Sequence, residues 1–127
     1  MLKQILILII SSIVLIFSGI WEIKYIENSS RYLLSDIEYS KNALNNNNFE
    51  LAKAHLDKLE KTWRNIKQTW NMFVLQEEID EVDNIITTYK VHTKYDNLEE
   101  AMVDCELLTS MIKDIVQKHK IKCENIL

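Results

Sequence analysis

Two tryptophans, Trp63 and Trp70, are the residues outside the N-terminal region whose type and spacing could most directly do chemistry. They are seven residues apart, so on a helix they share one face, and Phe73 follows within a turn. Rings of this kind can stack on a sugar or line a pocket for a lipid or ring-shaped ligand. Both tryptophans also fall on a longer apolar stripe, which favours packing in a helical core. Trp63, Trp70 and Phe73 are therefore the candidate ligand or partner contacts, and core packing is the favoured interpretation.

The potential metal ligands do not form a recognisable site. His92 with Asp96 and His119 with Cys123 are spaced to share a helix face, but each pair supplies two ligands where zinc needs three or four. None of the three histidines follows a glutamate by three residues, as a di-metal bundle requires. The acidic run 77–83 lacks the glycine and the alternating ligands of a calcium loop, and it predicts a solvated helix face. We expect no metal and no cofactor.

The composition excludes whole classes of function. The chain has no proline and a single glycine, Gly19, whereas phosphate loops, dinucleotide turns and nucleophile elbows need glycine where the backbone bends sharply. We therefore expect no catalytic residues, and a protein that is not an enzyme. The 15 basic residues less Lys3 leave 14 against 19 acidic ones beyond the N-terminal run, a net charge of −5 that argues against binding nucleic acid.

The two cysteines, Cys105 and Cys123, would lie about 27 Å apart on one continuous helix, far beyond disulfide reach. They could pair only if the C-terminal tail folds back. We expect Cys105 to be a small core residue and Cys123 to be a free thiol in the tail.

An apolar run from Leu2 to Trp21 has the roughly 20 residues that a helix needs to cross a bilayer. It could be a retained transmembrane helix or a cleaved signal peptide. Its apolar core is at or beyond the roughly 7–15 residues of a signal peptide, no pair of small residues marks a cleavage site, and Trp21 is placed as an interfacial anchor. These features favour retention. They predict a transmembrane anchor over residues 1–21, contacting lipid through residues 2–21, and a separate domain over residues 22–127.

The charges flanking this run predict its orientation. Lys3 and the terminal amine precede it, whereas Glu22, Lys24 and Glu27 follow it with mixed sign. By the positive-inside rule the N-terminus is cytoplasmic and the rest lies outside, which makes a single-pass protein of the cell membrane.

Apolar residues recur at helical spacing in four further stretches. A stripe over residues 23–44 continues the anchor helix, and Asn45–Asn48 then break it. The second stripe comprises Phe49, Ala52, Leu56, Leu59, Trp63, Ile66, Trp70 and Phe73. The third comprises Met72, Leu75, Ile79, Val82, Ile86 and Tyr89. The fourth comprises Leu98, Ala101, Met102, Cys105, Leu108, Ile112, Ile115 and Val116.

The anchor predicts where the second helix stops. Residues 22–44 form about 35 Å of helix outside the membrane, and a helix returning from Phe49 uses up that length by about Phe73. A straight continuation would carry the acids of 77–83 into lipid, so we expect a turn near residues 71–76. Asp96 and Glu99 form a likeness of a capping box that opens the last helix. At the membrane end we expect a collar of aromatic and aliphatic side chains from Trp21, Trp70, Phe73, Ile121, Ile126 and Leu127.

Several short motifs, taken in order, resemble a known family. They are Trp21 with Tyr25-Ile26, Ser29-Ser30 and Leu33-Leu34, then Asn48-Phe49-Glu50 with Ala52, Leu59 and Trp63, then Trp70 to Phe73, Glu77-Glu78-Ile79-Asp80 and Asn125-Ile126-Leu127. In order and spacing the chain resembles the small membrane-anchored proteins of Firmicutes called domain of unknown function 4363. The resemblance implies membrane attachment and a helical domain, and it implies no activity.

The fold expected from these patterns is all-α: an N-terminal transmembrane helix that continues into an antiparallel up-down four-helix bundle. The expected function is that of an envelope protein with a helical interaction module for a protein partner or for itself, without catalysis. The alternative is a sensor bundle that binds a ligand or lipid in a pocket between helices near Trp63 and Trp70.

Overall fold

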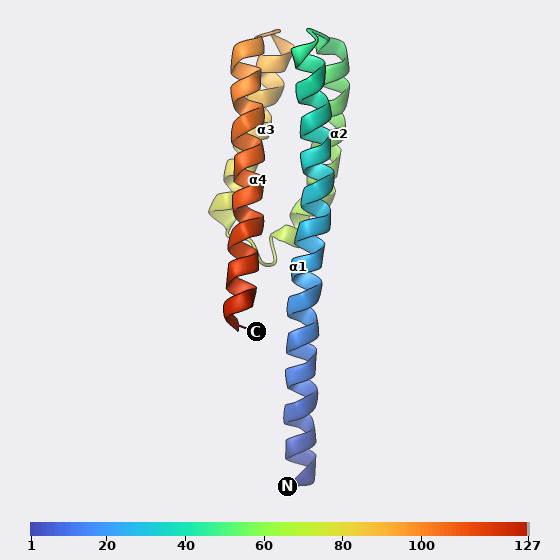
Figure 1. The fold of residues 1–127 in the computed structure, drawn as a ribbon, viewed down its shortest axis with the longest axis vertical. Helices are drawn as coiled ribbons and strands as arrows, with labels where there is room; N and C mark the ends of the chain where they lie inside the picture. The colour runs from blue at the N-terminus through green and yellow to red at the C-terminus, as the bar shows by residue number, and fades with distance from the viewer. Residues whose placement is uncertain (127) are drawn as a thin grey trace.

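The computed structural model describes residues 1–126, and they form four α-helices and no strand (Figure 1). The helices are α1 (Leu2–Asn45), α2 (Phe49–Trp70), α3 (Gln76–Lys94) and α4 (Leu98–Ile126). They run alternately up and down, joined by short turns, and α1 extends well below the other three. The predicted fold class is confirmed: a long apolar N-terminal helix leads into a bundle with three further packed helices.

Helix α1 is one continuous helix of 44 residues, about 66 Å long. Its N-terminal window of high hydropathy is entirely exposed, whereas one face of its C-terminal half, from Ile26 to Leu44, is buried in the bundle. The exposed part is long and apolar enough to cross a membrane, a test that a signal sequence would also pass. The helix does not break between the two parts because Gly19 is its single glycine and it holds no proline.

The turns at the upper end are made by asparagine and aspartate. Asn47 has a positive φ of 54°, and the Asn48 side chain accepts a hydrogen bond from the Leu51 amide, as the asparagine run predicts. At the other upper turn, Asp96 takes a φ of 55° and the Asn97 side chain accepts from Glu100 N. The prediction that Asp96 caps the last helix was therefore wrong. Asp96 lies in the left-handed conformation that ends the turn, and the next residue caps the helix.

The chain turns between α2 and α3 at residues 71–75, where the length of the first helix predicts it. Met72 and Leu75 fall in this turn and are 78% and 68% exposed, so the prediction that they open the third apolar stripe was wrong. The rest of that stripe is buried. The bundle core consists of Ile26, Leu33, Ile37, Ala43, Leu44, Ala52, Leu56, Leu59, Trp63, Ile66, Trp70, Val74, Ile79, Val82, Ile86, Tyr89, Ala101, Cys105, Leu108, Ile112 and Ile115.

Each helix packs against two neighbours, in the order α1, α2, α3, α4 and back to α1, so that within residues 1–126 α1 and α3 are diagonal, as are α2 and α4. The α1–α2 pair packs most closely and the α2–α3 pair least closely. Both cysteines lie on α4, buried and unpaired. Cys105 is the predicted core residue, and the end of the chain does not fold back toward it because α4 continues unbroken.

At the lower end, α4 lies beside the part of α1 that leaves the bundle. His119 Nε2 is 3.5 Å from a carboxylate oxygen of Glu22, and Lys120 pairs with Glu27 at 2.9 Å. Of the predicted collar, Trp21 and Ile121 are exposed and Phe73 is partly buried. Trp70 is fully buried and therefore cannot contact lipid, which corrects that member of the collar. The Ile126 side chain and Leu127 lie outside the described residues.

Candidate binding groove between α2 and α3

The two predicted tryptophans meet inside the bundle. Trp63 and Trp70 pack edge to face with ring centroids 5.6 Å apart, and each is almost wholly buried. The Trp70 indole N–H donates to Ser29 Oγ on α1 at 2.9 Å. The Trp63 indole N–H donates to an Asp83 carboxylate oxygen on α3 at 2.7 Å. The same helix face thus sends one tryptophan toward α1 and the other toward α3.

Phe73 packs against other residues than the two tryptophans do. Its ring packs edge-on against Tyr25 at 6.5 Å and against the His119 imidazole at 6.0 Å. His119 Nε2 also lies 2.9 Å from the carbonyl oxygen of Phe73. Phe73 therefore ties the α2–α3 turn to α1 and α4, and this contact joins three elements at the lower end of the bundle.

A groove of about 810 Å³ runs between α2 and α3 and has Trp63 in its floor. Its volume falls in the range of ligand-binding clefts. The residues that line it are Lys53, Leu56, Asp57, Glu60, Trp63, Arg64 and Lys67 on α2, with Asp83, Ile86, Thr87, Lys90, Val91 and Lys94 on α3. The groove exists because α2 and α3 are the least closely packed neighbours in the bundle.

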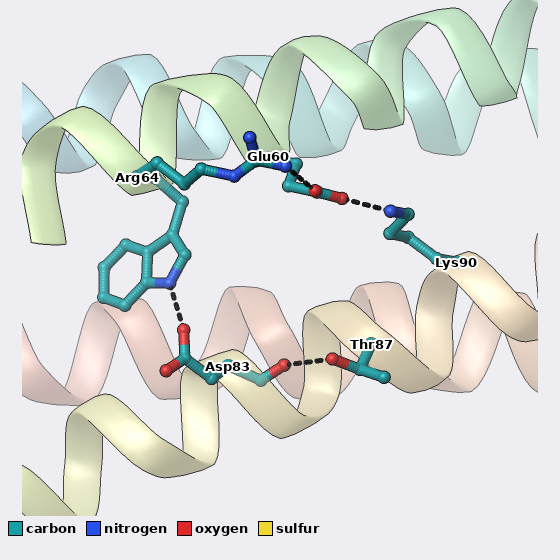
Figure 2. Close-up of polar contacts among 6 residues, drawn as sticks. Glu60, Arg64, Asp83, Thr87 and Lys90 are labelled. Atoms are coloured by element: carbon teal, nitrogen blue, oxygen red, sulfur yellow. Dashed lines mark hydrogen bonds and ion pairs between the residues drawn. The ribbon is translucent and has the colours of Figure 1, made fainter.

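Two charged contacts bridge the groove, and Figure 2 shows the upper one in full. The Glu60 carboxylate pairs with Arg64 one turn along α2 and with Lys90 of α3, the latter at 2.5 Å. Below it, the Lys67 ammonium pairs with Asp83 at 2.5 Å, and the second Asp83 oxygen accepts the Trp63 indole N–H. The walls are therefore connected by side chains, although their backbones stand apart.

The lysine across the groove sets the protonation of Glu60. Hydrogen bonding to Lys90, followed by that to Arg64, holds the pKa of the Glu60 carboxyl below its usual range and outweighs partial burial. The carboxylate is ionised at neutral pH, so the pair is a true ion pair. Because its side chain is still 19% exposed, salt will weaken it.

Charged side chains make up most of the lining of the groove, although much of the surface that they expose is aliphatic. The floor residues Leu56, Trp63 and Ile86 are at most 4% exposed, whereas Val91 on the α3 wall is 47% exposed. Five cationic and three anionic side chains line the groove, a local excess of positive charge on a chain with a net charge of −4. A molecule bound here would meet mainly the rim, its charged groups and the aliphatic stems of its lysines.

The remaining polar side chains in the core form structural contacts. Ser40 Oγ of α1 and Tyr89 Oη of α3 share a buried hydrogen bond across the diagonal of the bundle. Burial raises the pKa of the Tyr89 phenol. Burial also raises the pKa of the neighbouring Cys105 thiol, to about 11. Both groups stay neutral at physiological pH, which makes Cys105 a poor nucleophile.

The histidines have partners other than those at helical spacing. His92 Nδ1 lies 2.5 Å from Asp104 of α4, not beside Asp96, and His119 contacts Phe73 and Glu22. Within residues 1–126, no three histidine, cysteine, aspartate or glutamate side chains are grouped closely enough to hold a metal ion.

Sequence reasoning missed Asp83, which it assigned to a solvated face with the rest of the run 77–83. Asp83 is only partly exposed and holds together the lower part of the groove. A signal was present in the sequence: Asp83 adjoins Val82 of the third apolar stripe and so lies at its boundary. Its partner Trp63 is on another helix, and no local pattern specifies that pairing.

Comparison with known proteins gives one match. The family model described as "Domain of unknown function (DUF4363)" matches residues 20–126, nearly the whole chain. No curated protein and no solved structure matches it. The match begins at the end of the apolar run and therefore covers the helical bundle.

Proposed function

The chain belongs to the DUF4363 family, and from its architecture we propose that it is a membrane-anchored envelope protein whose helical bundle is a non-catalytic interaction module. The apolar part of α1 is retained and spans the cell membrane once, with the N-terminus in the cytoplasm and the bundle outside. The module binds a protein partner or a second copy of itself close to the membrane surface.

The continuity of α1 is the observation that carries this proposal. One helix contains both the exposed apolar segment and a quarter of the bundle, with no linker between them. A flexible linker would let a domain search for distant ligands, whereas a continuous helix holds the bundle at a fixed height and tilt. Such a geometry suits a module that presents a defined surface to neighbours in the same membrane.

The absence of catalysis rests on how the potentially reactive side chains are used. The His92 and His119 imidazoles pack into inter-helix contacts, and Cys105 is buried with a raised pKa. The α2–α3 groove is lined mainly by charged side chains, and its lining contains neither histidine nor cysteine.

The topology is tested with cysteines placed on exposed positions of the full chain, because the native Cys105 and Cys123 are buried. Thr87→Cys and Ser110→Cys lie on different helices and both are exposed. A membrane-impermeant maleimide should label both variants in intact cells, whereas Lys3→Cys at the other end should react only after permeabilisation. The reverse pattern contradicts the orientation, and loss of the N-terminal segment from mature protein contradicts retention.

The interaction is tested by crosslinking in native membranes followed by mass spectrometry. A photo-reactive residue at position 87, inside the groove, should capture one reproducible partner. The same residue at position 35, on the exposed side of α1, is the matched control. Absence of any crosslinked protein at position 87 above the control contradicts the proposal.

A second candidate function is ligand binding in the groove, supported by its volume of about 810 Å³ and by Trp63 in its floor. The test is tryptophan fluorescence of the full chain in micelles, titrated with candidate lipids and sugars. Quenching that Trp63→Phe abolishes and Trp70→Phe preserves would support a ligand site, because only Trp63 lines the groove. An unchanged spectrum, or quenching that survives Trp63→Phe, contradicts it.

A further inference from the structure

We propose that the α2–α3 groove receives the outer face of α4 from a second copy of this chain in the same membrane. This inference rests on the proposed function, since it needs the retained anchor and names the partner of the interaction module. It concerns contacts between copies, not those within the bundle.

The outer face of α4 is acidic with an apolar centre. Glu99, Glu100, Val103, Leu107, Ser110 and Asp114 recur at helical spacing and are all exposed. Val103 and Leu107 are among the exposed large apolar side chains, and within residues 1–126 the three carboxylates form no ion pair. This face is therefore the counterpart of the groove, whose rim carries an excess of lysine and arginine and whose most exposed apolar side chain is Val91.

The anchor imposes a geometric condition on the contact, and the two surfaces satisfy it. Copies that share a membrane and an orientation stand parallel, so only groups at the same height can touch. The turns at the upper end of the bundle lie at one level (Figure 1). Lys94 ends α3 and Glu99 and Glu100 begin α4 at that level.

Further down the bundle, residues of the groove and of the α4 face also lie at matching heights. Counted down from that level, Arg64 on α2 and Asp114 on α4 both lie about 23 Å below it. Between the charges, Leu107 lies about 14 Å below the level, close to Thr87 of the groove wall at about 10 Å. Opposite charges thus face each other at both ends of an apolar centre.

The groove lies between α2 and α3, whereas Leu107, Ser110 and Asp114 of the α4 face line a hollow between α3 and α4, so the two surfaces are neighbours that share no lining residue. One copy can therefore use its groove and its α4 face at the same time. A contact of this head-to-tail kind repeats from copy to copy and builds a ring or a chain. Confinement to the membrane raises the effective concentration of copies, so a small charged interface suffices.

The test uses two differently tagged full-length copies in one membrane, one with Thr87→Cys in the groove and the other with Ser110→Cys on α4. A short bis-maleimide should link the two tags, and the double variant T87C/S110C should give a ladder of higher species. Native Cys105 and Cys123 are buried and supply a low background. The matched control replaces Thr87→Cys with Ser35→Cys on the exposed side of α1. Equal yields from the two pairs overturn the inference.

A charge swap identifies the occupant. Lys94→Glu in the groove copy should lower the crosslinking yield several-fold, and Glu100→Lys in the α4 copy should restore it. If the groove instead binds an acidic segment of another protein, Lys94→Glu should lower the crosslinking of that protein, and Glu100→Lys should not restore it. Capture of only such a protein by a photo-reactive residue at position 87 overturns this inference and leaves the proposed function standing. Capture of nothing counts against both.

Discussion

Helix α2 meets its two neighbours in different ways. Toward α1 the contacts are close and mostly neutral: Trp70 donates to Ser29, and Ser40 of α1 donates to the Ala52 carbonyl. One ion pair is present there as well, between Lys58 of α2 and the buried Asp36 of α1 at 3.6 Å. Toward α3 the backbones stand apart and ion pairs bridge the gap, from Lys90 to Glu60 and from Lys67 to Asp83. One amphipathic helix therefore makes a closed interface on one side and an open, charged one on the other.

The two interfaces should respond differently to changes of salt and pH. Apolar burial and buried neutral hydrogen bonds are insensitive to salt and to moderate changes of pH. Exposed ion pairs contribute about 0–1 kcal/mol each and weaken with salt. We therefore expect the α1–α2 interface to set the stability of the fold and the α2–α3 interface to respond to ligands, salt and acid.

Truncation of the two tryptophans should give the largest difference between the two interfaces. Trp70→Ala should lower the free energy of unfolding by about 3–5 kcal/mol, because a fully buried indole leaves a cavity in the closed interface. Trp63→Ala should cost less, since water and rim side chains can enter its space from the groove. Denaturant unfolding of the full chain in micelles, followed by circular dichroism, measures both. An equal or larger loss for Trp63→Ala would show that the groove side is as closed as the α1 side.

The diagonal hydrogen bond between Ser40 and Tyr89 should give the next largest effect. Ser40→Ala or Tyr89→Phe alone should destabilise the fold by about 1–3 kcal/mol, because the remaining hydroxyl stays buried without this partner. The double variant should cost less than the sum of the two. Additive losses in this double-mutant cycle would mean that the two hydroxyls are not energetically coupled.

Acid should weaken the ion pairs on the α2–α3 side. Because Lys90 and Arg64 lower the pKa of Glu60, the folded chain holds this proton less tightly than the unfolded chain does. The stabilisation is complete above the ordinary pKa of about 4.5 and is lost as the pH falls from there through the lowered value.

Replacing Glu60 isolates that contribution. Glu60→Gln should cost about 0.5–1 kcal/mol at neutral pH and low salt, and less in high salt. It should also reduce the loss of stability in acid. The remaining loss is expected from Glu27 and Glu106, whose pKa values are lowered by Lys120 and Lys41. An acid profile that Glu60→Gln leaves unchanged would remove Glu60 from the account.

The smallest expected effect is on the reactivity of the two native thiols. Burial raises the pKa of Cys105 to about 11, so this thiol should react with an uncharged maleimide only when the bundle opens. Cys105 lies on α4 near Tyr89, away from the groove, so Glu60→Gln should leave its rate almost unchanged. Cys123, in the last turns of α4, should react faster because helix ends fray. A large acceleration of Cys105 in Glu60→Gln would show that opening the groove opens the whole bundle.

Much of this fold follows from local patterns in the chain. The 3-4 spacing of apolar residues specifies four helical faces, and the asparagine run specifies the first turn. The length of residues 22–44 predicts the turn at residues 71–75, because a longer α2 would carry the acidic run alongside the exposed apolar part of α1. The wrong predictions concern the ends of helices. Met72 and Leu75 lie in a turn and not in the following helix, and of the adjacent polar residues Asp96 and Asn97 it is Asn97 that caps α4.

The candidate site was only partly foreseeable. The shared face of Trp63 and Trp70 is a local property, and their mutual contact follows from it. The groove is different, since it depends on how far α2 stands from α3 and on which side chains bridge the gap. Asp83 and Lys90 are distant in sequence from Trp63 and Glu60, and no spacing rule relates them.

The sequence by itself determined the helices, their order and the membrane-sized apolar run, because these depend on periodicity and length along one chain. The tertiary structure alone decided that α2 closes against α1 and stays open toward α3, that Trp63 and Trp70 have different partners, and that α4 presents an acidic face to the outside. The reason is physical: periodicity states which face of a helix is buried, whereas the distance between two helices results from the packing of all four at once.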